Sequence, residues 1–396
     1  MKNLCMNESG RRVGFLDYVR GIAILSVFLF HSLDWVFHYS TLPWHGWFRD
    51  FSVPYSFLVL LPVSFGWAGV AIFFVVSGFC IHFSFHQHGR DWRSFFVRRF
   101  FRIYPPYFFA VILFGVFANS SRLDFSIRQI DWYQLIVHLL LIHNVDPYSF
   151  FTINSSFWSI AVEIQLYLIY PVLLMLVAKL GWRRALILVA GCEILTGGIQ
   201  GTLGVIYGID GIEELGKQQS LWHLFYYIAA SPLAFWFSWS LGAVIADAYL
   251  EKRALPLAKS SLFLWLVLAV GSNFIKPLSP FCFLLFAVST ATAISKLLSG
   301  ARPGIRIPDF CLKHLRLSGI WSYSIYLLHQ PLIGIGISIL VMICPVAGSH
   351  PLVQFASCLV LWFAIMLIGG LWYRLCELPS IACGKRIIQS AFSGRL

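Results

Sequence analysis

The sequence predicts an all-α fold, a polytopic integral membrane bundle of about ten transmembrane helices and one re-entrant segment, with both termini in the cytoplasm. Composition is the first observation: 59% of the 396 residues are hydrophobic and 12% are charged, whereas soluble domains usually have about 25% charged residues. The second is a series of apolar runs, most of them long enough to cross a bilayer. The third is that lysine and arginine gather in alternate loops between these runs, as expected for cytoplasmic loops.

The basic charge and the cysteines restrict the partners that we expect for the chain. Cytoplasmic loops that orient the helices explain the net charge of +12, so a nucleic-acid partner is not inferred. The nine cysteines show neither a CxxC pair nor zinc-ligand spacing, so we interpret them as small apolar helix residues and predict no metal site. One domain is expected, a membrane bundle over 15–373 between cytoplasmic tails at 1–14 and 374–396.

The first part of the bundle is predicted to contain three spanning helices, at 15–34, 66–85 and 103–118. Residues 35–64 are rich in aromatics and interrupted by prolines, which is typical of an outer loop at the membrane interface. The second helix leads into a basic loop that the positive-inside rule places in the cytoplasm; its arginines are Arg90, Arg93, Arg98, Arg99 and Arg102. The third helix is expected to begin with Pro105 and Pro106, because the first turn of a helix tolerates proline.

Residues 131–145 form the ambiguous segment, because they are apolar but shorter than the roughly 20 residues of a spanning helix. If they crossed the membrane, the next helix would end outside, and Lys179, Arg183 and Arg184 would lie on the wrong side. We therefore predict that this segment is re-entrant or buried from the outer face. The loops then alternate regularly between further helices at 157–178, 185–206, 221–247, 261–275, 281–297, 318–343 and 352–373.

The stretch Leu16–Ser32 is an apolar helix with Arg20 near its start and His31 near its end. Their separation is three helical turns to within about 20°, so both side chains lie on one face, about 16 Å apart along the axis. Ionisable groups in membrane helices usually face the bundle interior or a wet cavity. The pattern predicts a surface cation and a deeper proton-handling group. The alternatives are an arginine that snorkels and pairs with Asp17, and a hydrogen-bonded core histidine.

Four further residues are candidates for function. Arg99 and Arg102 are one helical turn apart, which suits a clamp for phosphate oxygens; the alternative is that they only orient the protein. Glu163 is a carboxylate in an apolar span and is therefore either functional or a structural partner for a histidine or arginine. His329 is either a ligand-facing group or a hydrogen-bonded core histidine.

The chain resembles acyltransferase family 3, a family of membrane acyltransferases. Five stretches match in order between residues 16 and 331: LDYVRGIAILSVFLFH, FFVVSGF, RRFFRIYPPY, FWSIAVEIQLYLIYP and YSIYLLHQP. The resemblance implies a ten-helix bacterial inner-membrane protein that moves an acetyl or other short acyl group from cytoplasmic acyl-CoA, a co-substrate, to a hydroxyl of a glycan or lipid-linked saccharide. The family's arginine and histidine of the first helix correspond to Arg20 and His31.

The resemblance also places the family's third-helix arginines at Arg99 and Arg102. Relatives often have two acids before a glutamine, whereas this chain has Glu163 followed by Ile164 and Gln165, so only Glu163 is carried over.

A mechanism follows as an expectation. Arg99 and Arg102 hold the acyl-CoA nucleotide, with Arg20 at the mouth of the cavity. His31 acts as general base on the acceptor hydroxyl or accepts the acyl group transiently. A carboxylate, from Glu163 or Asp34, orients this histidine.

His329 and Asp34 are assigned to binding of the acceptor, and neither a metal nor a permanently bound cofactor is expected. The rival class is a transporter or flippase that uses intramembrane histidine, glutamate and arginine as a relay. A third class is a structural or sensor protein, which would bind no acyl donor.

Overall fold

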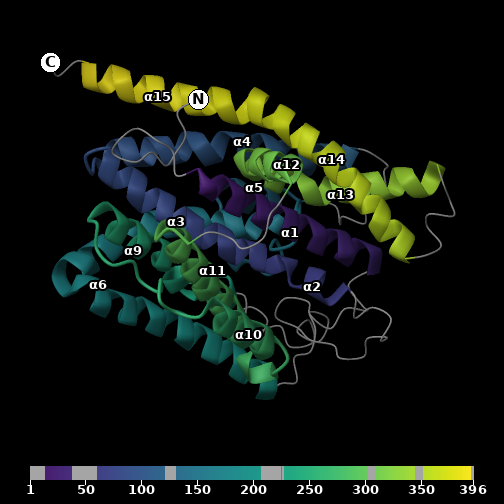
Figure 1. The fold of residues 1–396 in the computed structure, drawn as a ribbon. Coiled ribbons are helices and arrows are strands. Elements are labelled where there is room, and N and C mark those ends of the chain that lie inside the picture. The colour runs from purple at the N-terminus through teal and green to yellow at the C-terminus, as the bar shows by residue number, and fades with distance from the viewer. Residues whose placement is uncertain are drawn as a thin grey trace.

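The computed structural model describes residues 14–37, 60–120, 131–206, 224, 227–301, 308–343 and 351–393, and every regular element among them is helical (Figure 1). Within these described residues, seven segments are long and apolar enough to cross a membrane. This confirms an all-α, multi-pass membrane protein. The count of ten helices, the side of each terminus and the domain limits stay predictions, and the segments 1–13 and 38–59 lie outside the described residues.

The α-helices have the following bounds: α1 Phe15–Phe37, α2 Leu61–Ser64, α3 Gly69–Gln87, α4 Trp92–Ser120, α5 Trp132–Leu139, α6 Trp158–Ile206, α9 Trp236–Leu250, α10 Leu262–Asn273, α11 Cys282–Leu298, α12 Asp309–Ile320, α13 Ser322–Ile343, α14 Pro351–Trp372 and α15 Leu378–Ser393. Short 3₁₀ turns lie at Gly66–Ala68, His143–Val145, Ser155–Phe157, Pro232–Phe235 and Lys276–Phe281, and a π-helical turn at Tyr373–Glu377 joins α14 to α15.

The long helix α6 contains two of the predicted spans. Gly181, at φ 74° and ψ 162°, breaks the helical backbone in a conformation that only glycine adopts without strain. Figure 1 shows α6 turning back at the left of the molecule. Its two parts correspond to the helices predicted at 157–178 and 185–206, and each is long enough to cross a bilayer.

Helix α4 corrects the prediction for the third span. It begins at Trp92, so the basic segment predicted as a loop forms its first turns, and Pro105 and Pro106 lie inside the helix. A proline at 105 leaves the carbonyl of Phe101 without its helical N–H partner. That carbonyl instead accepts a hydrogen bond from the Ser380 hydroxyl of α15. The C-terminal helix thus supplies the bond that the proline removes.

The predicted C-terminal tail is largely helical as well. The π-helical turn carries α14 directly into α15, and α15 lies along α4 at the top of Figure 1. A loop was also predicted between residues 297 and 318, but α12 occupies positions 309–317 of it and packs against α1. Both segments are helices of mixed polarity, and the sequence pattern for apolar spans does not detect them.

The segment 131–145 is too short to span, as predicted. Asp131 caps α5 in a capping box with Gln134, and the chain reverses at Leu141, whose φ is 57°. A helix of this length rises about 12 Å, less than half of a bilayer core. The membrane face from which it enters stays a prediction.

Helix α3 lies inside the bundle, between α1, α9 and α11. Most of its residues are buried, and a helix that is apolar all round is expected in an interior. This placement matters for function, because α3 forms one wall of a cavity that Arg20, Arg99 and Glu163 also line.

Candidate active site

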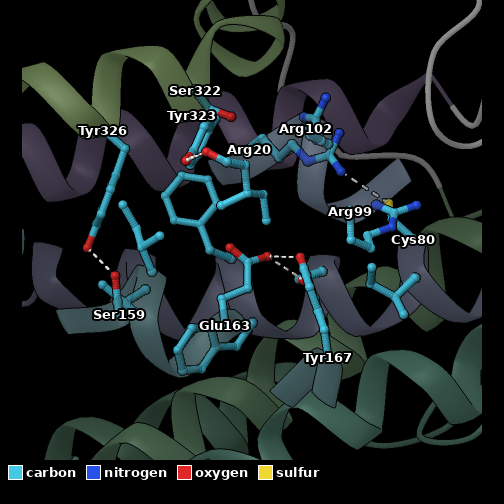
Figure 2. Close-up of a pocket in the computed structure, with 17 residues that line it drawn as sticks. Arg20, Cys80, Arg99, Arg102, Ser159, Glu163, Tyr167, Ser322, Tyr323 and Tyr326 are labelled. Atoms are coloured by element: carbon cyan, nitrogen blue, oxygen red, sulfur yellow. Dashed lines mark hydrogen bonds between the residues drawn. The ribbon is translucent and has the colours of Figure 1, made fainter. Parts of the chain in front are cut away.

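Helices α1, α3, α4, α6 and α13 surround a cavity of about 90 Å³. Figure 2 shows its polar side chains in two groups, with the arginines at one end and a serine–tyrosine pair at the other. Glu163 lies between the two groups (Figure 2). The residues that matter for the argument are Arg20, Arg99, Arg102, Ser159, Glu163 and Tyr326.

The arginine end brings together three guanidinium groups from two helices. Arg20 of α1 donates to the Cys80 sulfur at 3.2 Å, and Arg99 of α4 donates to the Ser84 hydroxyl at 3.3 Å. Arg99 is only 4% exposed. Arg102 lies one turn further along α4 and lines the same cavity. Converging guanidinium groups form a binding site for phosphate or carboxylate oxygens.

Glu163 connects α6 to α3 across the cavity. Its Oε1 accepts a hydrogen bond of 2.7 Å from the Ser77 hydroxyl and another from the Tyr167 hydroxyl. The Trp239 indole N–H of α9 donates to the Ser77 oxygen at 3.4 Å. Two hydroxyl donors thus hold one carboxylate oxygen in the middle of the cavity wall.

His31 lies in a separate polar cluster, three turns along α1 from Arg20. The His31 Nδ1 is 3.5 Å from an Asp34 carboxylate oxygen and 3.1 Å from the Gln330 amide nitrogen. Its ring centre lies 5.2 Å from that of His329. The Ser156 hydroxyl oxygen lies 3.5 Å from the Nε2 of each histidine. The His31 side chain is 18% exposed.

The histidine cluster and the cavity are separated by one layer of side chains. The hydroxyls of Ser159 and Tyr326 are 2.7 Å apart and close that end of the cavity. The Ser159 hydroxyl also contacts the Ser156 carbonyl at 3.2 Å, and the His329 Nδ1 lies 2.8 Å from the Tyr326 carbonyl. A group that enters the cavity past the arginines therefore ends close to the histidines.

The candidate residues from the sequence lie in two sites, the cavity and the histidine cluster. Arg20, Arg99, Arg102 and Glu163 line the cavity, whereas Asp34 and His329 accompany His31. Of the two acids considered as orienting groups, Asp34 is the one in contact with His31, and the bonds of Glu163 described above run to α3 and to its own helix.

Several members of the two sites were missed in the sequence, among them Ser77, Ser159 and Tyr167 in the cavity wall. Ser156 and Gln330 belong to the histidine cluster, and Tyr326 closes the cavity. Gln330 follows His329 directly, but a single sequence contains no signal that distinguishes it from its neighbours.

A further polar cluster, separate from the cavity and from the histidine cluster, joins α3, α6 and α9. Ligand atoms of His82, His86 and Asp247 lie within 4.8 Å of one another, a spacing at which a cation could bind. Asp247 already accepts hydrogen bonds from the Trp182 indole and from Arg253, and its other oxygen lies 3.1 Å from the His82 Nε2. A guanidinium on the same carboxylate opposes a second positive charge, so we interpret this group as a hydrogen-bond network.

Comparisons with known proteins point to one family. Residues 13–373 match the family of the acyltransferase domain, Acyl_transf_3. No solved structure matches the chain.

Three curated relatives are similar over parts of the chain. Peptidoglycan O-acetyltransferase OatA of Listeria monocytogenes is 28% identical over 297 residues, 68% of this chain and 46% of the relative. Acyltransferase MdmB of Streptomyces mycarofaciens is 29% identical over 178 residues, covering 44% and 42%. Nodulation protein 10 of Rhizobium leguminosarum is 30% identical over 207 residues, covering 48% and 51%. The chain thus spans about half the length of the relatives that it matches.

Proposed function

Because the chain belongs to the acyltransferase domain family, we propose that it is an integral membrane O-acyltransferase that moves an acetyl or other short acyl group from cytoplasmic acyl-CoA to a hydroxyl. The observation that carries this proposal is the cavity of Figure 2, in which three arginines lie at one end and the histidine cluster lies behind the other.

The arginine end suits the donor. Acyl-CoA carries phosphates, and Arg20, Arg99 and Arg102 offer forked donors that match phosphate oxygens. The adjoining cavity has a volume of about 90 Å³. Space of this size accommodates an acetyl or similarly short group at the end of the pantetheine arm. Glu163 faces the same space and is placed to accept a hydrogen bond from a pantetheine amide.

The histidine cluster suits the chemistry. A ring nitrogen of His31 takes the proton of the acceptor hydroxyl as the oxygen attacks the thioester carbonyl. The C–S bond then breaks, and the imidazolium returns the proton to the CoA thiolate. The Asp34 carboxylate, 3.5 Å from His31 Nδ1, stabilises the imidazolium while it exists. A variant of this route passes the acyl group through His31 itself.

We further propose that the acceptor is a glycan or lipid-linked saccharide, reached from a bacterial inner membrane. The relative OatA is named for peptidoglycan O-acetylation, which supports a glycan hydroxyl as the acceptor class. His329 is placed to contact the acceptor, because it lies beside His31. On this proposal, acyl-CoA acts as a co-substrate and no metal takes part in the transfer.

Donor binding is expected to depend on the forked shape of the clamp arginines. Arg99→Lys or Arg102→Lys keeps the charge but removes the planar fork, so the Kd for acetyl-CoA is expected to rise about tenfold. Calorimetry on detergent-purified protein measures it. The matched control is Arg93→Lys on the exposed side of the same helix, with unchanged affinity. If folded wild-type protein bound no acetyl-CoA, the donor proposal would fail and the transporter class would lead.

The clamp is expected to face the cytoplasm. In a cysteine-free background, a cysteine at the exposed position Arg93 is expected to react with an impermeant reagent only from the cytoplasmic side. A cysteine at Trp132, which is 79% exposed, is expected to react from the outer side. Labelling of both positions from one side would contradict the proposed orientation.

A further inference from the structure

Glu377 is a buried acid behind the arginine end of the cavity. It is the last residue of the π-helical turn between α14 and α15, and its exposed fraction is 0%. A π-helical turn inserts an extra residue into a helix, changes the direction in which the side chains point, and is frequent at functional sites. The family match ends at residue 373, so this acid lies just beyond the part of the chain that defines the family.

The carboxylate of Glu377 has two partners from different helices. Its Oε1 lies 3.2 Å from the NH1 of Arg102 on α4, and its Oε2 accepts a hydrogen bond of 2.8 Å from the Ser324 hydroxyl on α13. A buried carboxylate needs such partners to remain in an apolar interior. The contact therefore fixes where the Arg102 guanidinium lies.

We propose that Glu377 is a positioning residue that holds Arg102 for the phosphates of acyl-CoA. An unanchored arginine loses many rotamers when it binds a ligand, whereas a guanidinium held by the ion pair with Glu377 is already placed and can present its N–H donors to phosphate. The inference rests on the proposed function, because it assigns the donor phosphates to Arg102.

The fold supports this role through a second contact. Ser380, one turn after Glu377, bonds the Phe101 carbonyl of α4 next to Arg102. The C-terminal helix thus holds both the backbone and the side chain of the same turn of α4. A helix used only to cover α4 has no need to place a carboxylate against an arginine of the cavity.

The test is acetyl-CoA binding by calorimetry with purified full-length protein in detergent. Glu377→Ala is expected to raise the Kd about tenfold, because Arg102 loses its anchor. Glu377→Gln is expected to give an intermediate Kd, because the amide keeps the size of the side chain and the bond from Ser324 but loses the charge that pairs with Arg102. The matched control is Glu193→Gln, another buried glutamate, which binds Ser238 away from the cavity and is expected to leave the Kd unchanged.

Two further measurements separate positioning from folding. The double variant Arg102→Ala with Glu377→Ala is expected to bind acetyl-CoA no more weakly than Arg102→Ala alone, since Glu377 acts through that arginine. Acetyl-pantetheine, which lacks the nucleotide phosphates, is expected to bind Glu377→Ala and wild type equally. Additive losses, equal losses for both probes, or tighter acetyl-CoA binding by Glu377→Ala would each overturn the inference. An unchanged Kd in Arg102→Ala would instead overturn the proposed donor site.

Discussion

Replacing His31 with alanine is expected to reduce acyl transfer by about 10²–10⁴-fold, the usual loss when a general base is removed. Acetyl-CoA binding is expected to change little, because the arginines proposed to bind the donor lie elsewhere. Arg20 is three turns away on α1, and Arg99 and Arg102 are on α4. The measurement is the rate of CoA thiol release in membranes that contain the protein and its native acceptor, beside the Kd from calorimetry. Measuring both quantities on the same variant distinguishes a loss of acyl transfer from a loss of donor binding.

The reason for this expectation is the position of His31. Its Nδ1 has the Asp34 carboxylate and the Gln330 amide as neighbours, and its ring remains partly exposed. The layer formed by Ser159 and Tyr326 separates it from the cavity that takes the donor. The ring and its carboxylate neighbour match the pairing of a general base with an orienting acid, and the side chains of this layer have to move aside for the thioester to come within reach of the base.

Controls distinguish lost chemistry from lost folding. His31→Ala could cost about 1–3 kcal/mol of stability through unsatisfied polar partners, so its unfolding temperature is measured as well. Asp34→Asn and His329→Ala are each expected to slow transfer less than His31→Ala, because neither removes the proposed base. His86→Ala, outside both sites, is expected to transfer normally. Normal turnover by folded His31→Ala would remove this base from the mechanism and leave Glu163 as the leading candidate.

The sequence predicted what depends on local periodicity. Arg20 and His31 share a face of α1 because an unbroken helix fixes their relative direction. The pairing of His31 with Asp34 has the same origin, since residues three apart on a helix are neighbours. The separation of 131–145 from the spanning helices followed from its length and from the side on which it leaves Lys179, Arg183 and Arg184.

What the sequence could not show depends on contacts between distant segments. The prolines of α4 signalled a helix start, and only Ser380, far along the chain, explains how the helix continues through them. Glu377 lies in a segment whose polar composition resembled a tail, yet the structure buries it against Arg102. Gln330 contacts His31 from another helix. The spacing of residues in a single sequence does not indicate which distant residues are in contact.

Replacing Gly242 with alanine is expected to prevent α3 and α9 from packing, with a loss greater than the roughly 1–3 kcal/mol typical of overpacking. A Cβ at this position would lie 1.9 Å from the Val75 carbonyl oxygen and 2.5 Å from the Phe79 backbone nitrogen. Both are backbone atoms, so no side-chain rotation relieves the clash. The reciprocal position, Gly78 in the motif FFVVSGF, has the Trp239 carbonyl oxygen at 2.0 Å from its ideal Cβ.

This close approach of α3 to α9 also supports the site, and one variant tests both the packing and the site. Ser77, next to Gly78, receives the Trp239 N–H of α9 and donates to Glu163, so separating the helices displaces the cavity wall. Gly242→Ala is expected to give little monodisperse protein in detergent, and any folded fraction is expected to bind acetyl-CoA more weakly. The matched control is Gly191→Ala, where a Cβ meets nothing within 4 Å and a helical alanine is favoured by about 0.5–1 kcal/mol. Equal yield and melting for the two variants would show that α3 and α9 tolerate a wider separation than their backbones indicate.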